Sequence, residues 1–143
     1  MRHWILLALG LLSAGALFLG ACGGDDDTPK GGGSDEDYLR AICVGTTNFS
    51  NALLSKTNPD DIAQVIKDFI EEMKKTNPPA DLVKYNQDFI KYLEDAVAEP
   101  TSLVTRAPPL PDKEVARRIA ALEPTITECK DGTFFGRAAT ETP

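Results

Sequence analysis

The chain has 143 residues and a formal net charge of −7, with 22 acidic residues against 15 basic ones. This length is enough for one domain, and such an acidic balance argues against binding to nucleic acid and against electrostatic adsorption to anionic lipid. The only histidine and the only tryptophan are His3 and Trp4. Any chemistry that needs either side chain therefore depends on the fate of the N-terminus.

The N-terminus has the organisation of a secretory signal. A basic start at Arg2 precedes an uncharged, mostly apolar run of 16 residues, 4–19, which is shorter than the roughly 20 residues that span a bilayer as a helix. The run ends in Leu19-Gly20-Ala21-Cys22, and the hydrophilic residues 23–27 follow it. The stretch Leu19-Gly20-Ala21-Cys22 resembles the lipobox of bacterial lipoproteins, with glycine as a less typical occupant of its middle position.

The resemblance implies that residues 1–21 are a signal peptide and that Cys22 is acylated, with diacylglycerol and palmitate, to become the mature N-terminus. Several acyl chains anchor a protein stably, so we expect a lipid-anchored protein on the extracytoplasmic face of a bacterial cell membrane. An uncleaved membrane helix and a conventional cleavage that releases a soluble protein are the alternatives.

Cleavage before Cys22 would change the chemistry open to the protein. The mature chain would keep 14 basic and 22 acidic residues, a net charge of −8, and would contain no histidine. That excludes histidine-containing triads, histidine general bases and histidine-ligated metal sites. We expect no metal site and no cofactor.

Two cysteines, Cys43 and Cys129, remain once Cys22 is assigned to lipid. Exported proteins meet oxidising surroundings, where an even pair of cysteines is typical of a disulfide. Two thiols alone are too few for a structural zinc site. We predict a disulfide between Cys43 and Cys129; unpaired, inert core thiols are the alternative.

Residues 22–34 form a lipidated cysteine followed by a tether that is too polar and too rich in glycine to bury a core. Ser34 is a good N-cap, and acidic residues 35–37 suit the positive end of a helix dipole. Apolar residues then recur at three- and four-residue steps as far as Leu54. No charged residue occurs over residues 41–55, so this first helix should be the most buried.

Proline and asparagine mark the boundaries of the next two helices. The sequence Asn58-Pro59-Asp60-Asp61 predicts a helix start, and Asn77-Pro78-Pro79 predicts its end. A third amphipathic helix should run from about Pro79 to Glu99, with Asn86 inside its apolar arc as a candidate buried polar group. Residues 100–111 contain several prolines and predict an extended connection without regular structure.

A fourth helix is predicted to start near Asp112. Its apolar stripe continues to Cys129 only if the chain passes Pro124 in helical phase, so a kinked helix and a fresh short helix remain alternatives. Residues 133–143 read as a mobile tail, in which Phe134 and Phe135 are candidates to cover the bundle end. The predicted fold is all-α: a four-helix up-down bundle over residues 35–132, with a disulfide between its first and last helices.

One cluster of uncharged polar residues is a candidate for binding a small ligand. The cluster on the first helix is Thr46, Thr47, Asn48 and Asn51, and Tyr85 and Asn86 on the third helix are candidates to face it. Uncharged hydrogen-bonding groups beside apolar walls are typical of ligand pockets. The alternative is that they are ordinary buried or interfacial polar residues satisfied by neighbours and water.

The sequence contains no catalytic motif. Paired acids at residues 60–61 and 71–72 are better interpreted as a helix cap and surface charge than as general acids and bases. We therefore expect a non-enzymatic lipoprotein whose helical domain binds another protein or an envelope component. A helical bundle that binds a small ligand in an internal pocket is the alternative, and the partner or ligand is not identified by the sequence.

Overall fold

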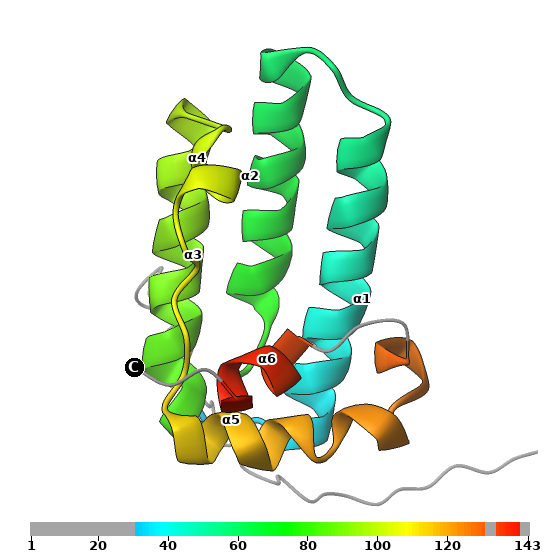
Figure 1. The fold of residues 1–143 in the computed structure, drawn as a ribbon, viewed down its shortest axis with the longest axis vertical. Coiled ribbons are helices and arrows are strands. Elements are labelled where there is room, and N and C mark those ends of the chain that lie inside the picture. The colour runs from blue at the N-terminus through cyan, green and yellow to red at the C-terminus, as the bar shows by residue number, and fades with distance from the viewer. Residues whose placement is uncertain (1–30, 131–133, 141–143) are drawn as a thin grey trace, which may run out of the picture.

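Three long helices form the frame of the domain. The computed structural model describes residues 31–130 and 134–140, so the predicted signal peptide, Cys22 and the tether up to residue 30 lie outside the described residues. The helices are α1 (Asp35–Leu54), α2 (Pro59–Lys75) and α3 (Val83–Ala98), and a 3-10 turn (Ala80–Leu82) precedes α3. They run up, down and up, with α2 between the other two (Figure 1).

The ends of these helices follow from local capping. Ser34 Oγ accepts a hydrogen bond from the Asp37 N–H at 3.1 Å, and Asn58 Oδ1 accepts one from the Asp60 N–H at 3.0 Å. Each bond satisfies a backbone donor that the first turn of a helix leaves without a partner. The predicted starts of the first two helices are confirmed. Over the described ranges, no helix combines the length and the apolar character needed to cross a membrane.

The segment after α3 does not form a fourth long helix. A short helix, α4 (Ser102–Thr105), leads into an extended segment, residues 107–112, which we call the proline strap. The strap descends beside α3 to α5 (Lys113–Ala120), which runs across the end of the bundle (Figure 1). The prediction that residues 100–111 lack regular structure is therefore wrong at α4. The all-α class is confirmed for the described residues, which contain no strand.

The predicted four-helix up-down arrangement is not confirmed, and Pro124 is the physical reason. Pro124 lies in a 3-10 turn (Glu123–Thr125), and Ile126 after it is extended, with φ −100° and ψ 119°. A second 3-10 turn (Thr127–Cys129) follows. The eight residues of α5 give a helix of only about 12 Å, too short to pack along the length of α3.

The predicted pairing of Cys43 with Cys129 is present. The two sulfur atoms lie 2.07 Å apart and the two Cα atoms 5.1 Å apart. This disulfide joins the lower part of α1 to the second 3-10 turn. It therefore fixes the C-terminal segment to the bundle even though that segment is not a continuous helix.

An arginine makes a second connection at the same end of the bundle. Arg118 on α5 donates hydrogen bonds to both carboxylate oxygens of Asp35, at 2.8 and 3.0 Å, and to both of Asp81, at 2.6 and 3.0 Å. The bonds from Arg118 lower the pKa of the Asp81 carboxyl from its ordinary value. Arg118 thus ties α5 to the start of α1 and to the turn before α3.

The predicted domain boundaries need two corrections. Residues 134–140, predicted as part of a mobile tail, form α6 (Phe134–Thr140), in which Phe135 is fully buried. Of the two residues predicted to cover the bundle end, Phe135 is part of the hydrophobic core and Phe134 packs against it. At the other end, the N–H groups of Gly32 and Gly33 donate to the Pro78 carbonyl at 3.1 and 3.2 Å, so the last part of the predicted tether is bound to the domain.

Candidate functional site

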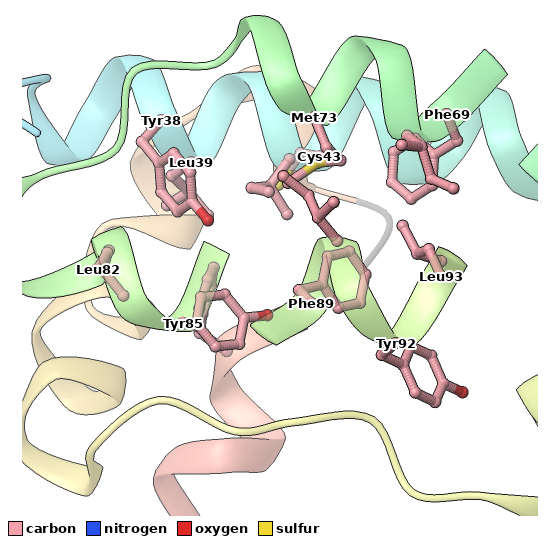
Figure 2. Packing of buried hydrophobic residues seen from close by; sticks show 14 of the residues in the cluster. Tyr38, Leu39, Cys43, Phe69, Met73, Leu82, Tyr85, Phe89, Tyr92 and Leu93 are labelled. Atoms are coloured by element: carbon pink, nitrogen blue, oxygen red, sulfur yellow. The ribbon is translucent and has the colours of Figure 1, made fainter. Parts of the chain in front are cut away.

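A row of aromatic side chains follows one face of α3. Tyr85, Phe89 and Tyr92 are spaced four and three residues apart, which places them on the same side of a helix. Ring centroids are 6.1 Å apart for the first two and 6.2 Å for the last two, with planes inclined by 14° and 18°. Tyr92 extends from α3 toward the strap, and Tyr85 lies near α6 (Figure 2). The row offers nearly parallel ring faces.

The proline strap runs alongside this aromatic row (Figure 1). The Tyr92 hydroxyl lies within hydrogen-bonding distance of the Leu103 and Arg106 carbonyl oxygens, at 3.1 and 3.3 Å, and burial raises the pKa of that hydroxyl. This contact holds the chain at the point where α4 gives way to the strap. Pro108, Pro109 and Pro111 then favour extended backbone. The strap is therefore held away from α3 as a separate wall rather than folded onto it.

Helix α6 forms the third wall, and a buried carboxylate positions it. Glu123 is 5% exposed, and its Oε1 accepts a hydrogen bond from the Phe135 N–H at 2.6 Å. The bond satisfies a donor in the first turn of α6, where a negative charge also meets the positive end of the helix. Phe135 then packs against Tyr85 at 5.7 Å between ring centroids, and Phe134 meets Phe89 edge to face at 6.0 Å.

Between these three walls lies a cleft of about 250 Å³, which we call the aromatic cleft. All its lining side chains are apolar or aromatic except Arg137, which lies on α6. Burial raises the pKa of the Tyr85 hydroxyl, so this phenol stays neutral at physiological pH. The lining residues are Tyr85, Phe89, Pro108, Pro109, Leu110, Pro111, Phe134, Phe135, Arg137 and Ala138.

The predicted ligand-facing residues do not meet in one pocket. Tyr85 lines the aromatic cleft, whereas Asn51 is exposed on α1. Asn48 lines a separate hollow of about 110 Å³ between α1 and α2. Thr46 is partly buried, and its Oγ1 has no hydrogen-bond partner among the described residues. The predicted cluster is therefore divided among several places.

Asn86 is fully buried, as its position in the apolar arc of α3 predicts. Its Oδ1 accepts a hydrogen bond from the Tyr38 hydroxyl at 3.0 Å, while its Nδ2 has no partner in the described part of the chain. Burial raises the pKa of the Tyr38 hydroxyl. The Tyr38–Asn86 pair links α1 to α3 inside the core, so Asn86 has a structural contact that accounts for its burial.

Two other features are weaker candidates for a site. A groove of about 270 Å³ between α2 and α3 is open and is lined by charged side chains, and an ion pair between Lys74 and Glu94, at 3.3 Å, bridges it. Within residues 31–130 and 134–140, no group of three or more histidine, cysteine or acidic side chains could hold a metal ion. Of these three concave sites, the aromatic cleft has the most apolar lining.

Comparison of the chain with protein-family models, curated proteins and solved structures finds no match. The site must therefore be interpreted from its own geometry.

Sequence reasoning found one residue of the aromatic cleft, Tyr85, and missed the others as a group. The signals were present but separate: a proline-rich connection at 108–111 and an aromatic pair at 134–135. Nothing in their spacing places these segments beside α3. Glu123 was also missed, because its acceptor role depends on the turn at Pro124.

Proposed function

We propose that the protein is a lipid-anchored, extracytoplasmic binding domain that holds a small apolar ligand in the aromatic cleft. The observation that carries the proposal is the cleft itself, with aromatic walls formed by α3 and α6 and an apolar wall formed by the strap. Ligand pockets are typically concave and apolar, with a few polar groups that orient the ligand. A volume of about 250 Å³ lies just below the usual range for drug-sized ligands, which starts at about 300 Å³. The ligand should therefore be a compact one, such as a fused aromatic ring system.

Binding of a neutral aromatic probe tests the site. We expect 1-naphthamide to bind the chain of residues 22–143 carrying Cys22→Ser, which retains every residue of the described fold. Leu110→Asp should weaken this binding at least about tenfold, because it places a carboxylate in an apolar site. The measurement is isothermal titration calorimetry.

The matched control for that experiment is Leu54→Asp. Leu54 is 86% exposed at the end of α1, and Leu110 is 50% exposed on the strap. Both variants add one negative charge to an accessible leucine position, but only Leu110 lines the cleft. Equal loss of binding in the two variants, or no binding to the parent protein, would rule out the proposed site.

The membrane anchor is the second part of the proposal, and the lipobox resemblance at Cys22 supports it. We expect protein extracted from membranes to have the intact mass of residues 22–143 plus the diacylglycerol and acyl groups on Cys22. Mass spectrometry measures this directly. A chain that still begins at Met1, or one that starts at Cys22 without acyl groups, would contradict the anchor without affecting the cleft.

A further inference from the structure

The Tyr85 hydroxyl is a polar group that α3 places in the wall of the aromatic cleft. Tyr85 is only 6% exposed, and its ring is packed between the rings of Phe89 and Phe135, at 6.1 and 5.7 Å between centroids. Within the described part of the chain its contacts are these ring contacts, and its hydroxyl makes no hydrogen bond. The raised pKa of this hydroxyl accordingly has burial as its cause.

The other two tyrosines of the chain differ from Tyr85 in this respect. The Tyr38 hydroxyl donates to Asn86 Oδ1 at 3.0 Å, and the Tyr92 hydroxyl lies 3.1 Å from the Leu103 carbonyl oxygen. Buried polar groups are nearly always hydrogen-bonded, and an unmade bond costs free energy. A buried phenol without a partner therefore needs an explanation at Tyr85 that it does not need at Tyr38 or Tyr92.

The cleft is where a partner can reach this hydroxyl. Among the described residues, the polar side-chain atoms that are both fully enclosed and unpartnered belong to Thr46, Asn86 and Ser102. The Tyr85 hydroxyl is not one of them, so it keeps some accessible surface although the residue is buried. Because Tyr85 lines the aromatic cleft, we place that surface at the cleft.

The chemistry of a buried phenol limits what it can bind. A phenol carries one O–H donor, and burial raises the pKa of the Tyr85 hydroxyl, so the proton stays on the oxygen at physiological pH. It therefore offers one hydrogen bond and no charge. In an apolar site, a few placed polar groups of this kind fix the orientation of a ligand whose body the walls hold.

We propose that the Tyr85 hydroxyl donates a hydrogen bond to a neutral acceptor atom of an aromatic ligand in the cleft. This inference rests on the proposed function and specifies its ligand: a compact aromatic molecule with a ring nitrogen or a carbonyl oxygen. Rings are expected rather than alkyl chains, because Tyr85, Phe89 and Phe134 line the cleft with aromatic faces and edges. Aromatic pairs gain stabilisation beyond the area that they bury.

Two isosteric probes test the inference. Quinoline and naphthalene have the same shape and are both neutral at neutral pH, but only quinoline has an acceptor nitrogen. Equilibrium dialysis against residues 22–143 carrying Cys22→Ser measures the affinity for each probe. We expect quinoline to bind about fivefold more tightly than naphthalene. Tyr85→Phe should remove this preference, keep the affinity for naphthalene and leave the urea denaturation midpoint unchanged, because no hydrogen bond within the protein is lost.

Tyr38→Phe is the matched control, since Tyr38 lies outside the cleft lining and its hydroxyl is bonded to Asn86. It should lower the urea denaturation midpoint and keep the preference for quinoline. Equal affinities of the parent protein for the two probes would overturn the acceptor inference while leaving the proposed binding site intact. A preference that survives Tyr85→Phe would assign the bond to another donor and also overturn it, as would loss of the preference in both tyrosine variants. Binding of neither probe would overturn the proposed function itself.

Discussion

Glu123 has a role that its chemistry alone does not suggest. Acidic side chains are rarely buried without a partner, and the partner of this one is a backbone N–H twelve residues later, at 2.6 Å. The carboxylate therefore acts as a cap for α6, supplied from outside that helix. Because α6 forms one wall of the aromatic cleft, Glu123 positions the site without lining it.

Substitution of Glu123 tests this role. We expect Glu123→Ala to lower the free energy of unfolding by about 1–3 kcal/mol, because it leaves the Phe135 N–H buried without a partner. Glu123→Gln keeps an oxygen acceptor and should cost less. Urea denaturation measures both. Glu128→Ala is the control, since Glu128 makes an exposed ion pair with Arg40 at 3.6 Å and should cost less than about 1 kcal/mol. Equal effects of the two alanine variants would contradict the capping role.

At the scale of the elements, the sequence predicted the ends of helices well, because the residues next to each end decide where a helix begins or stops. Ser34 and Asn58 cap helices as their sequence context indicates, and Pro78 and Pro79 follow the end of α2. The predicted start of the fourth helix near Asp112 is confirmed by α5, but a continuous helix to Cys129 is not formed, because the backbone turns at Pro124. A periodic stripe also results when separate turns bury the same residues, so periodicity alone does not reveal the break.

The site was less predictable than the helices. Helix α6 has seven residues, including a glycine, and isolated helices of that length are unstable in water. Its stability depends on Glu123 and on aromatic contacts with α3, which are tertiary interactions. The cleft unites residues 85–89, 108–111 and 134–138, and only the path of the strap and the crossing of α5 bring them together.

At the scale of the whole molecule, one covalent bond joins the two ends of the domain. Cys43 and Cys129 are 86 positions apart in sequence, and closing a loop of this size lowers the entropy of the unfolded chain by an amount worth about 4–5 kcal/mol. Small domains have a total stability of about 5–15 kcal/mol. The disulfide is therefore a large share of what keeps the domain folded.

Removal of the Cys43–Cys129 disulfide should destabilise the domain strongly. We expect the double variant Cys43→Ser, Cys129→Ser to lose about 4–5 kcal/mol of unfolding free energy, measured by urea denaturation against the same chain with both cysteines. Both are replaced so that no free thiol remains to react. An unchanged denaturation midpoint, or free thiols detected by mass spectrometry in the unreduced parent protein, would contradict this prediction.

The contact of Gly33 with the turn before α3 limits how the domain can be oriented relative to an anchor at Cys22. A Cβ at Gly33 would lie 1.7 Å from the Asn77 carbonyl oxygen, so only glycine permits this close approach. This contact fixes the point at which the chain enters the domain, at the end of the bundle that α5 crosses (Figure 1). A domain held at Cys22 would then turn its α5 end toward the bilayer and its α1–α2 turn outward (Figure 1).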